Sequence, residues 1–411
     1  MPDAGQAQIG ILPCPGGMAF AQKIYDHLEA ITKDKFEERI RSLSRSYKLP
    51  RTEIIRQMNL TNDMMPSSVD FDEPIDQYRT PNYLVPAQYT WFANGEFKTE
   101  ILASVRNSDV YIVQDVSNRY PISFPRTDQP QTLSVNDHIM CLLVTVDAAM
   151  QAGAMQVSVV LPTYPYSRQH KKRGRESLSA ARIGQILEFL GVARIVTLDI
   201  HSREIENTFN HLRIENLHGA YQIIKVLATV VDLKDENLVI VSPDTGAVER
   251  NKFFASILGK PLGMLYKERD YSRAAQSAEK GNITDMKLLG SVAGKIVFMS
   301  DDMLGTGGTL IKAMRTLKDM GARKLICAVS LPLFSAHAVD TFDNAYREGL
   351  FDHIIGTNAV HHDESVLGRE WYLSTDVSNL FARIIYRLHH SRSLGSLLDD
   401  RSVIKDLLKR S

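Results

Sequence analysis

The chain has 411 residues, and its 48 basic and 48 acidic side chains give a formal net charge of zero at pH 7. This length predicts two domains of ordinary size, and the charge balance excludes a general attraction to nucleic acid or to an anionic membrane. We therefore expect no nucleic-acid partner and no membrane partner, and any phosphate binding must come from a local group of residues.

The cysteines and the apolar segments bear on the cellular location. Cys14, Cys141 and Cys327 are far apart in the sequence and form no CxxC pair, which argues against a disulfide framework or a zinc site. The N-terminal residues lack the basic and long apolar regions of a signal peptide, and no apolar run approaches the roughly 20 residues of a membrane span. A cytoplasmic protein is the expectation.

In chain order, the first unusual region is residues 33–82. Its first part is charged and polar and predicts one or two surface helices, whereas its second part is rich in Asp, Pro and Ser and predicts a loop. We interpret residues 33–82 as an insertion. Residues 117–132, rich in Pro, Ser and Thr, predict a second exposed loop.

From about residue 100, short β-branched runs alternate with longer helical patterns. This alternation predicts parallel α/β sheets with helical crossovers. The strands are expected at 109–115, 156–164, 194–202, 238–246, 295–302, 324–331 and 353–358, and clear helices at 179–191 and 308–321. Gly321 follows the second helix, where a left-handed cap is expected.

Three of these strands end in polar residues, at 198–202, 242–247 and 300–309. Ligands of parallel α/β sheets gather outside the carboxyl ends of the strands. The three segments therefore predict the place of the binding site.

The segment SDDMLGTGGTL, residues 300–310, is the most informative of the three. Its glycines allow a tight turn whose N–H groups can face a phosphate at the start of the next helix, and its threonines add hydroxyl groups. Asp301 and Asp302 would repel a phosphate unless they bind sugar hydroxyls or Mg²⁺. The segment therefore favours a phosphorylated sugar over an incidental strand-to-helix turn. The residues expected to bind it are Asp301, Asp302, Gly305, Thr306, Gly307, Gly308 and Thr309.

This segment resembles the phosphoribosyl-binding motif that type I phosphoribosyltransferases share with ribose-phosphate diphosphokinases, the phosphoribosyl pyrophosphate synthetases. The motif alone does not distinguish the two. Segments 92–115, 164–184, 197–209, 241–250 and 266–270 resemble those of the diphosphokinases and occur in the family's order. The similarity covers about residues 8–32 and 83–400, and the chain is identified as a member of that family.

The resemblance implies a role for individual residues. Catalytic roles are implied for His201, Lys267 and Arg269, and the pyrophosphate loop would be Asp244, Thr245 and Gly246. A Mg²⁺ cofactor is implied, with His201 and Asp244 as its contacts. Asp199, two residues before His201, is expected to share this metal role. ATP contacts fall on Arg168, Gln169 and Lys171, and on Phe92, Asn94 and Glu96, which would receive adenine from a neighbouring subunit.

The implied fold is α/β, with two phosphoribosyltransferase-like domains, each a mainly parallel sheet flanked by helices. We expect the first domain at 8–218, carrying the insertion and completed by residues 385–411, and the second at 219–384. The implied reaction converts ATP and ribose 5-phosphate to AMP and phosphoribosyl diphosphate. A homo-oligomer, dimer or hexamer, is expected.

Two positions depart from the family pattern. Gly305 stands where the family usually has aspartate, and Asn210 stands where it often has an acidic residue. Two alternatives therefore remain open beside the diphosphokinase. One is a non-catalytic or regulatory paralogue, against which the presence of His201, Lys267 and Arg269 argues. The other is a phosphoribosyltransferase, against which the ATP-contact segments argue.

Overall fold

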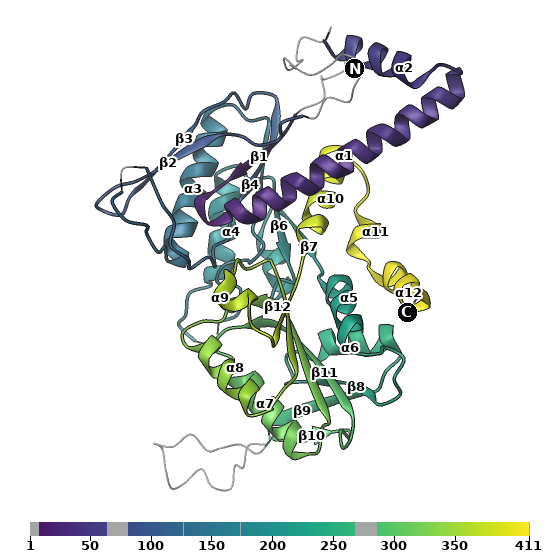
Figure 1. Cartoon of the computed structure of the whole chain (residues 1–411). Helices are drawn as coiled ribbons and strands as arrows, with labels where there is room; N and C mark the ends of the chain where they lie inside the picture. Colours follow the sequence, from purple (N-terminus) through teal and green to yellow (C-terminus); the bar gives the residue numbers. More distant parts are fainter. Residues whose placement is uncertain (1–7, 64–80, 126, 173, 268–285, 411) are drawn as a thin grey trace.

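A computed structural model describes residues 8–410, apart from 64–80, 126, 173 and 268–285 (Figure 1). The chain forms two lobes, each built on a mainly parallel sheet with helices on both faces (Figure 1). The predicted fold class is therefore confirmed. Within the described residues, no helix has the length and apolar character needed to cross a membrane.

The first sheet has five parallel strands in the order β1-β4-β5-β6-β7. These strands are β1 (Gln8–Pro13), β4 (Ser108–Val113), β5 (Gln156–Val160), β6 (Arg194–Leu198) and β7 (Arg213–Leu217). Helices α3 (Val135–Gln151) and α4 (Ser179–Phe189) pack on one face, and α1 (Met18–Tyr47) and α10 (Ser378–His389) on the other. The hairpin of β2 (Ala87–Trp91) and β3 (Phe97–Ile101) lies beside α3.

The second sheet has seven strands, and all of them are parallel except the edge strand β10, which is antiparallel to β9. Their order is β10 (Met286–Leu289), β9 (Leu262–Lys267), β8 (Leu238–Ser242), β11 (Ile296–Leu304), β12 (Lys324–Pro332), β13 (His353–Thr357) and β14 (Tyr372–Thr375). One face carries α7 (Gly308–Asp319) and α8 (Ala338–Arg347), and the other carries α5 (Ala220–Val230) and α6 (Val248–Leu258). The short helix α9 (Glu364–Leu367) precedes β14.

One apolar cluster is shared by the two sheets. Met303 of β11 and Leu331 of β12 are buried in the same cluster as Val196 and Leu198 of β6. Because these residues lie near the carboxyl ends of their strands, this packing brings the polar segments that follow the two sets of strands together. The shared core is therefore what positions the site.

Helix α1 continues without a break into the region read as an insertion. Its first turns bury Phe20, Ile24 and Leu28 on one face, a spacing of four residues that fits an amphipathic helix. The helix ends at Tyr47, and Lys48 follows it with a left-handed φ of 55°. Helix α2 (Arg51–Asp63) then packs on the far end of α1 through a small core of Ile40, Ile54 and Ile55, away from the lobes (Figure 1).

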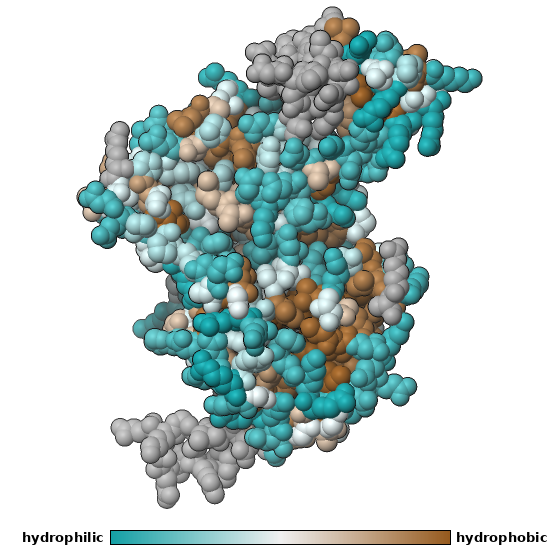
Figure 2. All heavy atoms as spheres, viewed as in Figure 1, coloured by the Kyte–Doolittle hydropathy of each residue, from teal (hydrophilic) through white to brown (hydrophobic). Residues whose placement is uncertain are grey.

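The C-terminal segment differs from the expectation that it completes the first domain. Helix α10 packs against α1 of the first lobe, but α12 (Arg401–Arg410), which follows the short α11 (Gly395–Leu398), packs against α5 and α6 of the second. Ile404 of α12 is fully buried there. The chain end thus ties both lobes together. Figure 2 shows the apolar surface of this part of the second lobe.

Candidate active site

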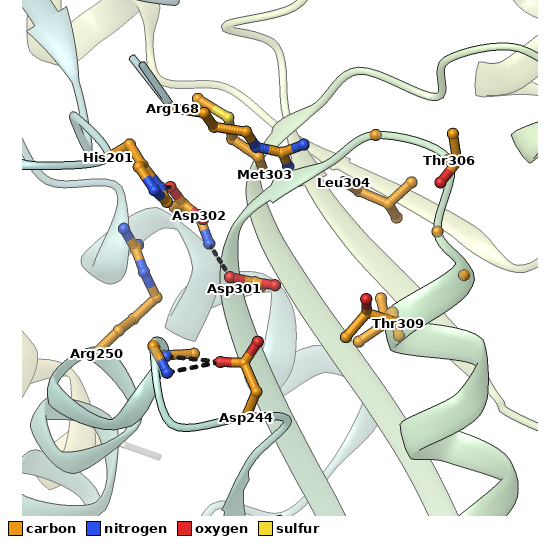
Figure 3. Close-up of a pocket in the computed structure, with 16 residues that line it drawn as sticks. Arg168, His201, Asp244, Arg250, Asp301, Asp302, Met303, Leu304, Thr306 and Thr309 are labelled. Carbon is orange, nitrogen blue, oxygen red and sulfur yellow. Dashed lines mark hydrogen bonds and ion pairs between the residues drawn. The ribbon is translucent and has the colours of Figure 1, made fainter. Parts of the chain in front are cut away.

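A cavity of about 410 Å³ opens where the two lobes meet (Figure 3). It brings together all three polar segments that the sequence predicts, although they come from different strands. Its polar and glycine lining comprises Arg168, His201, Asp244, Gly246, Arg250, Asp301, Asp302, Gly305, Thr306, Gly307, Gly308 and Thr309.

Strand β11 carries the acidic pair into this cavity. The strand runs to Leu304, so Asp301 and Asp302 lie inside it, and it extends two residues beyond the end expected at Asp302. The neighbouring strand β8 pairs with β11 only as far as Phe298, whereas β12 accompanies it to Leu304. Asp301 and Asp302 therefore lie past the last residue of β11 that pairs with β8, and they face the cavity on that side.

The turn after β11 is shaped by Gly307. Its φ of 77° is left-handed, and a Cβ added there would lie 2.3 Å from Cε2 of Phe342. Helix α7 starts at Gly308, so the exposed N-terminus of this helix opens into the cavity beside Thr306 and Thr309 (Figure 3). Free N–H groups and threonine hydroxyls at a helix start are suited to an anion.

His201 reaches from the first lobe to the second. Its Nδ1 lies 2.6 Å from Oδ2 of Asp302. The hydrogen bond to Asp302 raises the pKa of His201. Burial is the largest single influence on the pKa of Asp302 and raises it, but the bond to His201 and the charges of His201 and Arg250 together outweigh burial and lower the pKa. We therefore describe the two as an ion pair across the lobe boundary.

Asp301 behaves differently from its neighbour. Burial, reinforced by the adjacent charge of Asp302, raises the pKa of Asp301 to about 7. The backbone N–H of Asp302 donates to Oδ1 of Asp301 at 2.8 Å. The pKa of one carboxyl group of the pair is thus lowered and that of the other raised, so Asp301 is the more easily protonated of the two.

Asp244 lies on the loop between β8 and α6. Its Oδ1 accepts hydrogen bonds from the N–H groups of Gly246 at 2.8 Å and Ala247 at 3.0 Å, and the carboxylate faces Asp301 across the cavity (Figure 3). Thr245, predicted for the same loop, is exposed and is not among the cavity-lining residues. The loop therefore offers a fixed carboxylate with one oxygen that these two bonds leave free.

Asp199 does not line this cavity, contrary to the expected metal role. Its side chain is 6% exposed, and Arg250 lies 3.2 Å away as an ion-pair partner. Ser330 donates to it at 2.5 Å, and His218 lies 2.9 Å away. Burial would raise the pKa of Asp199, but Arg250 and His218 outweigh burial and lower it. Because these groups occupy both oxygens, we correct the interpretation: Asp199 fixes Arg250 and joins the lobes.

A second cavity, of about 640 Å³, adjoins the first. Its lining comprises Arg168, Gln169, His170, Lys171, Glu176 and Ser177. Arg168 lines both cavities, and the ring of His170 lies 5.2 Å from that of His201. Lys171 is exposed and pairs with Glu204 at 3.1 Å. The predicted nucleotide contacts Arg168, Gln169 and Lys171 are thus together, next to the acidic pair.

The remaining predicted residues lie elsewhere. Phe92, Asn94 and Glu96 form the turn between β2 and β3, where Phe92 is 42% exposed, and they line neither cavity. Lys267 is the last residue of β9, and Arg269 lies outside the described residues. The structure therefore does not test Arg269 or the side chain of Lys267.

Arg250 is the cavity residue that the sequence analysis missed. It lies on the first turn of α6, six residues after Asp244, and its Nη1 also donates to Ser330 at 3.0 Å. The charges of Asp199 and Asp302 raise its pKa despite burial. The sequence signal that could have identified Arg250 is its position in the first turn of the helix that follows the strand-end loop of Asp244.

For a cation, the oxygen-rich wall of Asp244, Asp301 and Asp302 is the type of surface that Mg²⁺ binds. Within the described residues, no three His, Cys, Asp or Glu side chains converge closely enough to hold a metal alone. Mg²⁺ often keeps waters and shares its remaining ligands between one or two carboxylates and substrate phosphates. The residues present therefore fit a magnesium ion that is held jointly with a phosphorylated ligand.

Two mainly parallel α/β lobes, the second of which carries this turn at the boundary between them, are the architecture of proteins with phosphoribosyltransferase-type domains. Family models match the chain as "N-terminal domain of ribose phosphate pyrophosphokinase" over residues 66–191 and as "Phosphoribosyl transferase domain" over 212–365. The chain is 32% identical to a ribose-phosphate pyrophosphokinase of Parasynechococcus marenigrum, over 74% of this chain and 84% of that protein. It is 31% identical to ribose-phosphate pyrophosphokinase A of Dictyostelium discoideum, over 75% of this chain and 88% of that protein. The chain belongs to the ribose-phosphate pyrophosphokinase family.

The fold agrees with a solved structure. The phosphoribosylpyrophosphate synthetase of Mycobacterium smegmatis superimposes with a TM-score of 0.66 at 22% identity, covering 93% of this chain and 99% of that one. At this identity the likeness concerns the fold alone.

Proposed function

We propose that the chain is a ribose-phosphate diphosphokinase that transfers the diphosphoryl group of ATP to the C1 hydroxyl of ribose 5-phosphate. The products are AMP and phosphoribosyl diphosphate. Family membership supports the reaction, and one observation carries its placement: His201, Asp244 and the Thr306 turn line a single cavity beside the cluster of predicted ATP contacts.

The 5-phosphate of the sugar would lie on the amides and hydroxyls of residues 305–309, at the start of α7. The ribose diol would bind Asp301 and Asp302, which are acceptors when ionised. This arrangement would leave C1 directed toward Arg168 and the second cavity, which Arg168 also lines and where the triphosphate would lie.

Catalysis in this proposal depends on alignment and on charge neutralisation. His201 and Arg250 place positive charge in the cavity, and Lys267 and Arg269 would add two more cations. Mg²⁺, held by Asp244 together with the substrate phosphates, would neutralise charge on the transferred group. Asp199 holds Arg250 in place through their ion pair.

Phe92, Asn94 and Glu96 would receive adenine from a neighbouring subunit, because their turn is exposed and lines neither cavity of the same chain. A homo-oligomer, dimer or hexamer, is therefore part of the proposal. Gel filtration with light scattering that gave only monomer would contradict it. The three buried, unpaired cysteines are compatible with a cytoplasmic enzyme.

The test is release of AMP from MgATP by purified protein, with and without ribose 5-phosphate. We expect AMP only with both substrates, and its loss in Lys267→Ala. A protein that binds ATP yet releases no AMP would support the non-catalytic paralogue, and consumption of phosphoribosyl diphosphate with a nucleobase would support the transferase.

A further inference from the structure

Residues 334–336, which follow β12, lie directly against the turn between β11 and α7. The backbone N–H of Ser335 donates to the carbonyl oxygen of Gly305 at 3.0 Å. The ring of Phe334 is fully buried and packs edge-on against Phe342, with 5.9 Å between the ring centroids. Phe342 in turn lies against the left-handed glycine of the turn. The position of the turn therefore depends on the position of residues 334–336.

The backbone of residues 334–336 is strained. Phe334 has a φ of 42° and Ala336 a φ of 53°, although neither residue is glycine. A side chain makes this left-handed region unfavourable, so such a residue stays there only where surrounding contacts hold it. Two such residues beside the predicted sugar-phosphate turn indicate that this backbone is held in place by a further contact.

Arg119 of the first lobe makes that contact. It lies in the segment that the sequence predicts as an exposed loop, but it is half-buried, and its Nη1 donates to the carbonyl oxygen of Phe334. The guanidinium is charged, and a charged donor forms a stronger hydrogen bond than a neutral one. The next residue, Tyr120, also reaches the second lobe, where its hydroxyl lies 3.3 Å from Nδ1 of His362.

Arg119 is not among the residues that line either cavity, so it would act through the turn and not on the ligand. We propose that Arg119 is a positioning residue, which holds Phe334 in its strained conformation and thereby fixes the turn that binds the phosphate of ribose 5-phosphate. This inference rests on the proposed function, since that function assigns the sugar phosphate to the turn. Because Arg119 lies in the first lobe and the turn in the second, sugar binding would depend on the contact between the lobes.

The test is isothermal titration calorimetry of ribose 5-phosphate into protein saturated with Mg²⁺ and α,β-methylene-ATP, an analogue whose α–β bridge cannot be cleaved. Arg119→Met keeps most of the side-chain length but no donor. We expect it to raise the dissociation constant of ribose 5-phosphate by about three- to ten-fold, since a hydrogen bond from a charged donor is lost. The dissociation constant of the analogue should stay within about two-fold of wild type, because the predicted ATP contacts line the second cavity.

Two further variants serve as controls. Arg119→Lys keeps a charged donor and should bind ribose 5-phosphate more tightly than Arg119→Met. Ile404→Ala removes apolar packing in a different cluster of the second lobe, so it controls for a general loss of stability and should leave both constants within about two-fold of wild type. If Arg119→Met does not fold, Arg119→Gln, with a neutral donor, takes its place, and weaker binding of ribose 5-phosphate than in wild type is again expected.

An Arg119→Met variant that binds ribose 5-phosphate as wild type does, or that weakens binding of the analogue equally, would overturn the inference. The same holds if Ile404→Ala shows an equal loss, or if Arg119→Lys binds no better than Arg119→Met. Wild-type protein that binds no ribose 5-phosphate would overturn the inference together with the proposed function. If wild-type protein binds ribose 5-phosphate but releases no AMP from MgATP, only the proposed function fails, and the comparison of variants still decides the role of Arg119.

Discussion

Replacing Gly307 by alanine should damage the sugar-phosphate turn. A left-handed conformation costs a non-glycine residue about 1–2 kcal/mol. The added Cβ would also lie 2.3 Å from Cε2 of the buried Phe342, an overpacking that costs about 1–3 kcal/mol. Together these predict a destabilisation of about 2–5 kcal/mol. In a domain of this size each kcal/mol lowers the melting temperature by about 2–4 °C.

Gly308→Ala is the matched control, because nothing lies within 4 Å of a Cβ at that residue and its φ is not positive. As the first residue of α7, Gly308 should tolerate alanine with a change of less than about 1 kcal/mol. Circular dichroism melting of both variants gives the comparison. The reasoning is refuted if Gly307→Ala melts within about 1 °C of Gly308→Ala, since neither strain nor overpacking would then act at Gly307.

Ile404→Ala should lower the free energy of unfolding by about 2–5 kcal/mol, because Ile404 is fully buried between α12 and the second lobe. The control Val403→Ala, at a residue that is 42% exposed, should change the free energy of unfolding by under about 0.5 kcal/mol. Equal melting temperatures of the two variants would show that α12 is not docked. His201 has a raised pKa, so its bond to Asp302 stabilises the ligand-free fold fully below about pH 6.5 and is lost as pH rises through the folded value. The melting temperature of wild type minus that of His201→Gln should therefore be larger at pH 6 than at pH 9, and a constant difference would contradict the ion pair.

Much of the fold was predictable because its signals are local. The β-branched runs became β4, β5, β6, β8, β11, β12 and β13, and Gly321 has the left-handed φ, 87°, expected after α7. The rule that strand ends of parallel sheets meet at one edge also placed His201, Asp244 and the Thr306 turn in one cavity. These features were predictable because each depends on a few consecutive residues, such as a β-branched run for a strand or a glycine for a left-handed cap.

The remaining features depend on partners that are distant in the sequence. Asp199 looked like a metal ligand because it precedes His201 by two residues, but Arg250 and Ser330 from the other lobe occupy its carboxylate. The length of β11 depends on its pairing with β12 through Leu304. The docking of α12 likewise depends on the apolar side chains that α5 and α6 present to it, which no local pattern reveals.

The central claim is that this cavity brings a pentose phosphate and a nucleoside triphosphate together for transfer of a diphosphoryl group. The most direct measurement follows ATP labelled with ³²P in its γ-phosphate, incubated with Mg²⁺, ribose 5-phosphate and the protein. The account predicts that the label moves into the sugar product, and that one molecule of AMP forms for each molecule of labelled phosphoribosyl diphosphate. Label released as inorganic phosphate, or AMP formed without ribose 5-phosphate, would contradict it.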